Sequence, residues 1–338
     1  MKKAFFSRLI ISIITVGTIV GIVPVTPTHA QAVDPSAAQG LQISPAIVEL
    51  NAEKGKTYTL NLKVTNVTMA GLVYSTTVND FDAKDETGAA NVLLTSTLPP
   101  TASIITWLKT GSEFSLDSHE SRSITAEITV PTDAEAGGHY GVLRFSGHAP
   151  NVSGTGVGLS ASAGMLILIR VAGNITESAN LASFYTVSGT SQTSFFEYAP
   201  INFVTRIKND GNIHVKPTGT ITIQDAFGNS VGTVPVNDTK AIVLPTSIRR
   251  FNSEYKSGWM FGMYTANLTL GYGTTGQAIT NTITFWVIPY KLILVLLFCL
   301  ATFVFIASRL IKVYNKRIIA KAKNENVVKN KKANKTKQ

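Results

Sequence analysis

Hydrophobic and polar residues alternate strictly in several short stretches of this chain. In TYTLNLKVTN, residues 57–66, every second residue from Tyr58 to Val64 is apolar and the residues between them are polar. SITAEITV, residues 123–130, divides in the same way. A period of two places the apolar side chains on one face of an extended strand, so both stretches are predicted to be half-buried β-strands.

Eight further segments are also predicted to be strands, and clusters of Gly, Pro, Asn and Asp separate them. They are residues 43–50, 73–78, 140–145, 165–171, 201–207, 220–224, 264–270 and 282–288. Outside two apolar runs near the termini, no stretch keeps a helical period. Many short strands divided by turn residues indicate an all-β fold built of antiparallel sandwiches.

Two parts of this pattern resemble each other, which predicts a repeated architecture. An alternating strand ends at Asn66 and another at Asn209, and a Gly-x-Tyr motif opens a later strand at Tyr140 and at Tyr264. A tyrosine at such a place is typical of the tyrosine corner of immunoglobulin-like sandwiches, with a buried ring and a hydroxyl bonded to nearby backbone. We therefore expect two such sandwiches, at residues 40–173 and 174–289.

The first apolar run has the features of an export signal. Three basic residues precede it, and Ala30-Gln31-Ala32 after it offers the small residues that a signal peptidase reads. Residues 1–32 are therefore predicted to be a signal peptide, with residues 33–39 as a linker. An uncleaved membrane anchor is the alternative.

The second apolar run, LILVLLFCLATFVFIAS at residues 292–308, contains no charged residue. Aromatic and basic residues flank both of its ends, as they do in membrane-spanning helices. Residues 290–312 are therefore predicted to be a single transmembrane α-helix. The lysine-rich segment 313–338 is predicted to be a cytoplasmic tail by the positive-inside rule, which leaves residues 33–289 outside the cell membrane.

The net charge of +10 belongs to the ends of the chain. From Arg309 onward there are eleven Lys and Arg against one Glu, and the first 32 residues add three bases, which leaves −3 for the rest. Nucleic-acid binding outside the cell is therefore not expected, whereas the tail is suited to contact anionic lipid. The single cysteine, Cys299, lies in the predicted helix, so the exported part has no disulfide.

The order of motifs resembles the WxL-interacting surface proteins of Gram-positive bacteria. The first predicted sandwich carries ISPAIVEL, GKTYTLNLKVTN, a Trp107 segment, FSLDSHESRSITAEITVP and DAEAGGHYGVLRF; the second carries NDGNIHVKPTGTITIQDAFGNSV, LPTSIRRF, GMYTANLTLGYG and TFWVIP. The resemblance implies two immunoglobulin-like domains, a membrane helix and a basic tail. It further implies binding of peptidoglycan or a WxL partner by the first domain, and of a host or neighbouring-cell ligand by the second. It carries over no binding residue.

Candidate catalytic and metal-binding groups are scattered. The exported histidines are His119, His139, His148 and His214, and none has the spacing that places two imidazoles on one metal. Surface or strand-end positions are therefore the favoured interpretation. The stretch from Asn79 to Glu86 holds Asp80, Asp82 and Asp85, which only partly match a calcium loop, so a solvated loop is the favoured interpretation. We predict no catalytic residue, no metal, no cofactor and no enzymatic activity.

Three aromatic segments are candidates for a binding surface, although sandwich cores need such rings too. They are Trp107, residues 195–198 and residues 255–259. Leu244-Pro245-Thr246-Ser247 resembles the start of a sortase signal, but its internal position argues against covalent wall attachment.

The polar stretch KNDGNIHVKPTG, residues 208–219, is predicted to be a turn and a short strand of the second sandwich. Asp210-Gly211 is assigned a tight turn with positive φ, and His214 a place in the strand.

The predicted function is non-catalytic binding or scaffolding at the cell surface, with a cell-wall polymer or a WxL-type secreted protein as partner. Partner choice is assigned to loops at the sandwich ends or to an exposed strand edge. Two alternatives stay open: a β-sandwich glycan hydrolase or metal-dependent enzyme, and a chaperone-like domain that docks a secreted protein.

Overall fold

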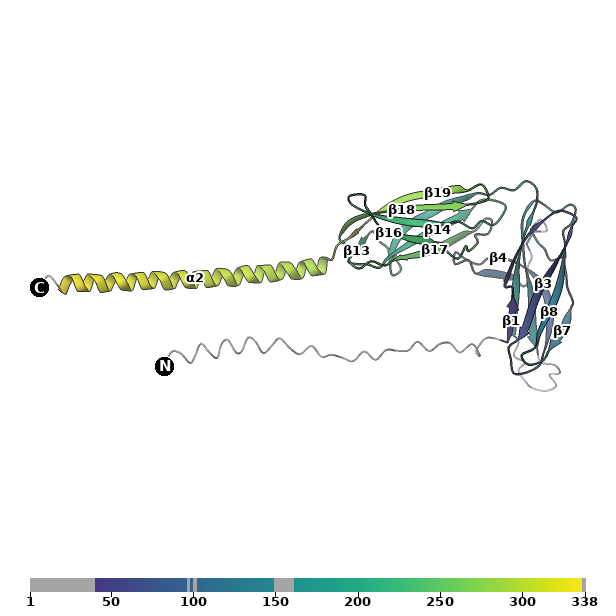
Figure 1. Ribbon diagram of the computed structural model, residues 1–338, viewed down its shortest axis with the longest axis horizontal. Coiled ribbons are helices and arrows are strands. Elements are labelled where there is room, and N and C mark those ends of the chain that lie inside the picture. The colour runs from purple at the N-terminus through teal and green to yellow at the C-terminus, as the bar shows by residue number, and fades with distance from the viewer. Residues whose placement is uncertain (1–39, 96–97, 100–101, 149–160, 336–338) are drawn as a thin grey trace. The chain divides into compact units, whose positions relative to one another are not determined.

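The structure of the protein is a computed structural model that describes residues 40–95, 98–99, 102–148 and 161–335. Residues 40–338 cluster as one unit. The predicted signal peptide and linker, residues 1–39, lie outside the described residues. Figure 1 shows the described chain as sheets followed by a single long helix.

Two sheets form the first sandwich, which we define as strands β1 to β10. One sheet has the order β1-β3-β8-β6, and the other has the order β2-β10-β9-β4-β5, with β7 also paired to β4. Their bounds are β1 Leu41–Ser44, β2 Ile47–Ala52, β3 Thr57–Asn66, β4 Leu72–Ala83, β5 Ala90–Leu93, β6 Leu108–Lys109, β7 Glu113–Leu116, β8 Ser121–Thr129, β9 Gly137–His148 and β10 Ala161–Val171.

Two further sheets form the second sandwich, strands β11 to β19. Their orders are β12-β11-β14-β17 and β13-β19-β18-β15-β16. The bounds are β11 Ala179–Ser188, β12 Ser191–Gln192, β13 Phe195–Phe196, β14 Ile201–Asn209, β15 Thr218–Asp225, β16 Ser230–Val236, β17 Ile248–Tyr255, β18 Gly262–Tyr272 and β19 Gln277–Val287.

Each sandwich encloses its own hydrophobic core. The alternating residues of β3 and β8 that the sequence assigns to one face, such as Leu62 and Ile128, are buried in the first core together with Phe145. The second core centres on Phe203 and Phe285, whose rings meet edge to face at 5.8 Å. Burying each such side chain stabilises the fold by about 1.5–3 kcal/mol, so the two all-β sandwiches follow from the alternation as predicted.

The two sandwiches share the order of their main strands: β1-β3-β8 corresponds to β11-β14-β17, and β2-β10-β9-β4-β5 to β13-β19-β18-β15-β16. Contrary to the prediction, the pairing is not wholly antiparallel. β1 pairs antiparallel with β3, after which the chain crosses to the other sheet and β2 pairs parallel with β10. β11 and β13 repeat this crossing, with β13 parallel to β19. The predicted single strand 43–50 is therefore two strands, and Pro45, which has no N–H to donate to a ladder, lies at the break.

Asn66 and Asn209 end equivalent strands and do the same work in each sandwich. Both side chains are fully buried. The Asn66 amide donates to Ala70 O at 2.7 Å, and its oxygen accepts from Thr68 N at 3.0 Å. The Asn209 amide donates to Ile213 O at 2.8 Å, four residues on as before, and its oxygen accepts from the N–H two residues on. The predicted repeat is visible in this shared turn.

The two tyrosines of the Gly-x-Tyr motifs lie in equivalent strands, β9 and β18, but not at equivalent positions. Tyr264 pairs with Phe285 in its core, and its hydroxyl accepts a hydrogen bond from Phe261 N at 3.1 Å, as a tyrosine corner requires. Its counterpart by register is His139, which pairs with the core residue Ile169. Tyr140 is offset by one residue, so it faces away from the first core, and its prediction as a tyrosine corner is wrong.

One helix, α2, follows the second sandwich from Tyr290 to Lys335. Its part from Tyr290 to Ala320 is long and apolar enough to cross a membrane, and an 18-residue window within it has a mean hydropathy of 2.5. The helix runs beyond the predicted end at residue 312 and through most of the basic segment. At ~1.5 Å per residue it is far longer than the hydrocarbon core of a bilayer is thick.

Candidate functional site

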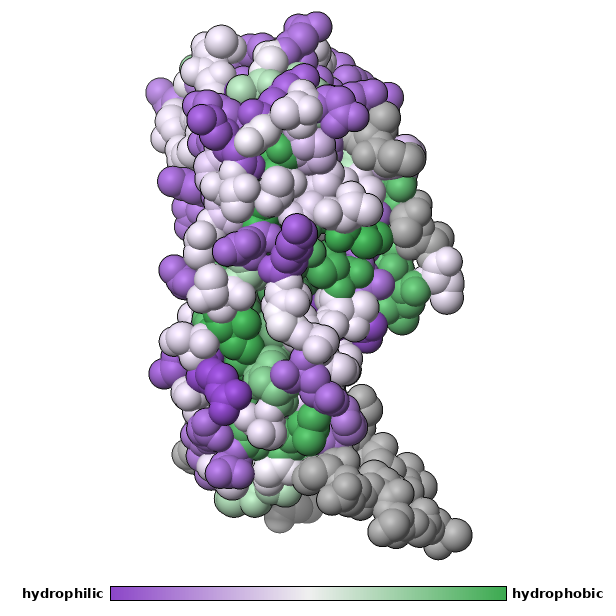
Figure 2. All heavy atoms as spheres, turned by 90° about the vertical axis from the view of Figure 1, so that its right-hand side faces the viewer, coloured by the Kyte–Doolittle hydropathy of each residue, from purple (hydrophilic) through white to green (hydrophobic). Residues whose placement is uncertain are grey.

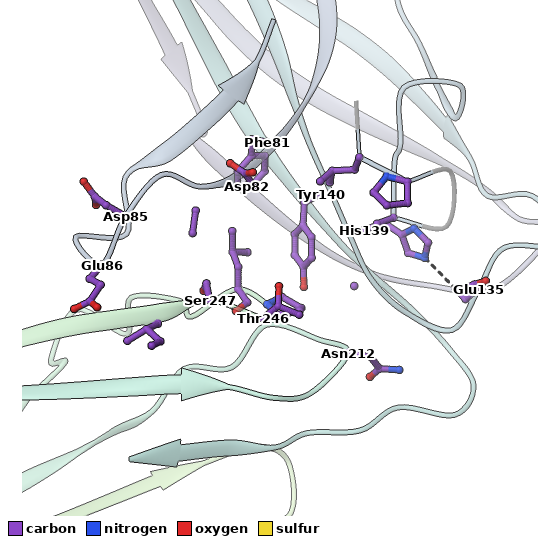
Figure 3. A pocket seen from close by; sticks show the side chains of 18 of the residues that line it. Phe81, Asp82, Asp85, Glu86, Glu135, His139, Tyr140, Asn212, Thr246 and Ser247 are labelled. Carbon is purple, nitrogen blue, oxygen red and sulfur yellow. Dashed lines mark hydrogen bonds between the residues drawn. The ribbon is translucent and has the colours of Figure 1, made fainter. Parts of the chain in front are cut away.

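A cavity of about 710 Å³ is lined by residues of both sandwiches, and we call it the cleft. Its apolar floor is formed by Phe81 and Tyr140 from the first sandwich and Leu244 from the second. These residues belong to a small third core that the two sandwiches share and that also contains Leu168. Figure 3 shows the labelled polar side chains around this floor. They are Asp82, Asp85, Glu86, Glu135, His139, Asn212, Thr246 and Ser247.

Tyr140 joins the two sandwiches through its hydroxyl. The hydroxyl oxygen accepts a hydrogen bond from His214 N at 2.8 Å and lies 3.2 Å from His214 Nδ1, to which it can donate. Burial raises the pKa of the Tyr140 hydroxyl, so it stays protonated. Burial also lowers the pKa of His214 and favours the neutral imidazole that accepts this bond. The one-residue offset on β9 thus turns a core tyrosine into a contact between sandwiches.

The polar stretch 208–219 is the part of the second sandwich that makes this contact. Asn212 O accepts from Gly138 N at 2.8 Å, and the Asn212 amide donates to Ala136 O at 3.3 Å. The Lys216 ammonium lies 2.5 Å from a Glu49 carboxylate oxygen. Between the end of β14 at Asn209 and the start of β15 at Thr218, only a bridge at Val215 is strand-like, so the short strand predicted around His214 is wrong.

Gly211 has a different role from the one predicted. It is not among the glycines with positive φ, so the predicted tight turn with positive φ at Asp210-Gly211 is wrong. A Cβ at this residue would lie 2.3 Å from Thr176 O, so the chain passes too close here for any side chain. Close packing of the two segments, and not left-handed backbone, requires the glycine.

A second link joins the sandwiches at the edge of the cleft. Arg206 donates to both carboxylate oxygens of Glu86, with Nε to Oε2 at 2.7 Å. Arg250 N also donates to Glu86 O at 2.7 Å. The guanidinium hydrogen bonds lower the pKa of Glu86, so it stays ionised.

The rim of the cleft is acidic. Asp82, Asp85 and Glu135 line it together with the paired Glu86, and no Lys or Arg is among its described lining residues. A neighbouring pocket of about 550 Å³ shares Asp82 and Asp85 but adds Lys216, Lys240 and Arg249, so its charge is mixed.

The four exported histidines take two kinds of position. His119 and His148 are exposed, as predicted, and His148 lies 3.6 Å from Glu113. His139 lies near the start of β9 and is buried, and the His214 side chain is only 10% exposed. His139 packs against Trp107 with ring centroids 4.4 Å apart, and its Nε2 lies 3.0 Å from Glu135 O. Burial lowers the pKa of His139.

The stretch from Asn79 to Glu86 is not the predicted solvated loop. Its first half continues β4 as far as Ala83, and Asp80 is fully buried, where it accepts from Leu98 N at 2.9 Å and Ser103 Oγ at 3.1 Å. Asp82 accepts from the Asn91 amide at 2.8 Å, and Asp85 accepts from Thr87 N at 2.8 Å. No group of three or more His, Cys, Asp or Glu suited to a metal occurs in the described part of the chain.

The aromatic candidates separate into core and surface. Trp107, Phe196 and Tyr255 are buried in the cores. Phe195, Tyr198 and Trp259 are exposed. Figure 2 shows that on the side of the first sandwich hydrophobic groups lie in separate patches between hydrophilic ones.

Leu244-Pro245-Thr246-Ser247, which resembles the start of a sortase signal, lies in the wall of the cleft. Leu244 is buried in its floor, and the Ser247 hydroxyl donates to Leu244 O at 2.7 Å. The sequence pattern did not predict the cleft. It is built by Tyr140, Asn212 and residues 244–248, and no spacing along the chain brings these together.

The sequence matches no known protein family and no curated protein. Among solved structures, the chain is similar to the Class 5 fimbriae chaperone CfaA, with a TM-score of 0.38, 12% identity, and 72% of this chain and 98% of that one covered. It is similar to the E. coli chaperone DraB with a TM-score of 0.34, 13% identity, and 72% and 96% covered.

A third similar structure is Salmonella enterica SafA pilin in complex with the SafB chaperone, with a TM-score of 0.33, 11% identity, and 74% and 97% covered. At TM-scores below 0.5, these structures say nothing of what this chain binds. The sandwich assignment rests on its own strand pairing.

Proposed function

We propose that this protein is a non-catalytic docking protein, anchored in the cell membrane by α2, that binds a segment of a partner protein in the cleft. The cleft carries the proposal, because it is a cavity of about 710 Å³ whose apolar floor and polar rim come from both sandwiches. Ligand sites in proteins combine a concave apolar surface with a few placed polar groups.

The charge of the cleft favours a protein partner over an anionic cell-wall polymer. The rim carries the carboxylates of Asp82, Asp85 and Glu135 without a lining cation. Complementary charge steers partners together and like charge repels them. A partner segment with an apolar side chain for the floor and a Lys or Arg for the rim fits this site.

The contacts of the carboxylates support binding over catalysis. Asp80 and Asp85 hold backbone N–H groups, Glu86 pairs with Arg206, and Asp82 holds an amide side chain. These roles are structural. A hydrolase that uses a pair of carboxylates would need two that are free to act as acid and base within reach of a substrate. Among the described contacts of the lining carboxylates, only the Glu135 carboxylate has no such structural partner.

The proposal extends to features that the resemblance to WxL-interacting proteins implies. The partner is a WxL-type secreted surface protein, and the domains divide as 40–173 and 174–289. Residues 1–32 direct export and 33–39 link the signal to the first domain, so the cleft lies outside the membrane. Residues 290–312 span the membrane and the basic segment 313–338 lies in the cytoplasm.

A charge reversal tests the site. Glu135 is exposed on the cleft rim, while Asp133 is exposed two residues away and does not line the cleft. With the full chain in phospholipid nanodiscs, E135K is expected to weaken binding of a purified WxL-type protein about tenfold, equivalent to ~1.4 kcal/mol. D133K is the matched control and is expected to bind normally. Equal effects of both variants would overturn the cleft as the site.

The same preparations separate the alternatives. Binding to peptidoglycan that E135K leaves unchanged, without binding to the protein, would favour a cell-wall ligand. Turnover of a cell-wall polymer that is lost in a carboxylate variant would replace docking with hydrolysis.

A further inference from the structure

Within the described part of the two sandwiches, the exposed large aromatic side chains lie at one end of the second sandwich. Across the described part of residues 40–289, six large aromatic side chains are exposed, with exposed fractions from 41% for Trp286 to 90% for Phe227. We call them the aromatic end: Phe195, Tyr198, Phe227, Trp259, Phe261 and Trp286. The exposed large hydrophobic residues of the first sandwich are Ile47, Met69 and Leu94, none of them aromatic.

The strand registers gather the aromatic end from four separate segments. Phe195 on β13 pairs beside Trp286 on β19. Gly262, directly after Phe261, pairs with Val287, the last residue of β19. Asp225 pairs with Tyr264, so the turn that carries Phe227 lies at this same end of the sheet.

This end of the sandwich is also where α2 begins (Figure 1). Only Ile288 and Pro289 separate β19 from the helix, and Ile288 N donates to Phe196 O at 2.8 Å. The Lys291 ammonium, in the first turn of α2, lies 2.7 Å from Glu197. The first turn of the helix is thus bonded to the strand segment that carries Phe195 and Tyr198.

The length of the apolar helix sets the depth of these residues. Its uncharged part, residues 292–308, has 17 residues. At ~1.5 Å per residue this is ~26 Å, slightly less than the ~30 Å hydrocarbon core of a bilayer. Tyr290 therefore lies at the lipid headgroup level when the helix spans, and Trp286, four residues earlier, lies next to that level.

We propose that the aromatic end inserts into the lipid headgroup layer and seats the second sandwich on the membrane. The proposal rests on α2 as the membrane anchor. Trp and Tyr rings are enriched at this layer because they are amphipathic. The nearby bases are already paired, Lys256 with Glu254 and Lys291 with Glu197. Contact is therefore apolar, and it depends little on salt or anionic lipid.

Spin labels on single cysteines test the depth of three sites in the full chain, reconstituted in phosphatidylcholine vesicles. Native Cys299 reports on the helix. In a Cys299→Ser background, Phe227→Cys reports on the aromatic end and Met69→Cys is the matched control. Met69 is 87% exposed on the first sandwich, close to the 90% of Phe227. Collision rates with oxygen, which enters lipid, and with a water-soluble nickel chelate measure the depth.

The expected result is a high ratio of oxygen to nickel collisions at residue 299, an intermediate ratio at 227 and a low ratio at 69. The ratio at 227 is expected to stay the same when phosphatidylglycerol replaces part of the lipid. A deep label at 299 with a fully aqueous label at 227 would overturn the seating and leave the anchor intact. An aqueous label at 299 would overturn both.

A second observable guards against disturbance by the label. Trp259 and Trp286 are exposed, whereas the remaining tryptophan, Trp107, is buried in the first core. Phosphatidylcholine brominated near the headgroup is expected to quench the emission of the unlabelled chain, and W259F is expected to lose part of that quenching. Two outcomes would contradict insertion into lipid. In the first, aqueous iodide quenches the emission of the unlabelled chain and brominated lipid does not. In the second, the emission changes only when a partner protein is added.

Discussion

The two sandwiches repeat one strand order but use their surfaces differently. In both, the first strand crosses between sheets, and a buried asparagine, Asn66 or Asn209, closes the turn after an equivalent strand. In the first sandwich, Tyr140 faces outward and contacts the second sandwich. In the second, the register-shifted Tyr264 stays in its own core. A shift of one residue on a strand is enough to exchange a core role for a contact role, because side chains alternate between faces.

The largest expected effect comes from the paired asparagines. Asn66→Ala and Asn209→Ala each leave several buried backbone groups unpaired, at about 1–3 kcal/mol per group, so each is expected to lower the free energy of unfolding by about 3 kcal/mol. Denaturant unfolding of the full chain in detergent measures this. Only N209A is expected to weaken partner binding as well, since Asn209 holds the segment that leads to His214. If both variants bind the partner equally well, the segment held by Asn209 does not contribute to the binding site.

The tyrosine pair gives the next effect. Tyr140→Phe leaves the N–H of His214 without its acceptor in a largely buried contact, and is expected to cost about 1–3 kcal/mol. Tyr264→Phe removes a bond to Phe261 N, whose own side chain is exposed, so water can replace it and the cost is expected to stay below ~1 kcal/mol. Thermal unfolding of the two variants compares these costs. A larger shift for Y264F would contradict the assignment of Tyr140.

Acid is expected to weaken the contact between the sandwiches. Burial lowers the pKa of both His139 and His214, so below their ordinary pKa of about 6.5 the unfolded chain binds protons that the folded chain does not. The contribution of these two histidines to the free energy of unfolding is therefore fully present above that pH. It is lost as the pH decreases through their pKa values in the folded chain. Glu49, Lys216 and Arg170 also act on His214. Melting temperatures between pH 8 and pH 5 test this, and H214Q is expected to flatten the slope. An unchanged slope would exclude His214 as a source.

The smallest effect is expected at the ion pair on the cleft edge. Arg206 and Glu86 are 30% and 39% exposed, so solvent weakens their attraction, and R206K is expected to cost about 1 kcal/mol or less. Lysine keeps the charge but loses the two-pronged geometry. If R206K costs as much as Y140F, the salt bridge and not the tyrosine dominates the contact. Thermal unfolding beside Y140F decides this.

The sequence predicted those parts of the fold that rest on local alternation. β3 and β8 were found because each apolar residue between Tyr58 and Val64, or between Ile124 and Val130, faces the first core or packs against it. β17 was missed, since Ser253 occupies one of its buried positions and hides the pattern. β13 was also missed, because it is only two residues long and shows no alternation.

The cleft could not be predicted, because it depends on contacts between distant segments. Residues 135–140, Asn212 and residues 244–248 meet only once both sandwiches are folded. The polar stretch 208–219 was recognised as unusual, but the chain pattern does not show that Asn212 O accepts from Gly138 N. The contacts that would have revealed the cleft are those between buried polar residues, and they are seen only in the folded structure.

Hydrogen–deuterium exchange of the full chain in nanodiscs, with and without a purified WxL-type protein, tests the cleft most directly. We expect the partner to slow exchange at residues 81–86, 135–140 and 244–248, with little change at the turns around Asn66. Slowed exchange confined to strand β8 or to the edge strand β16, with the cleft unchanged, would contradict the proposed site.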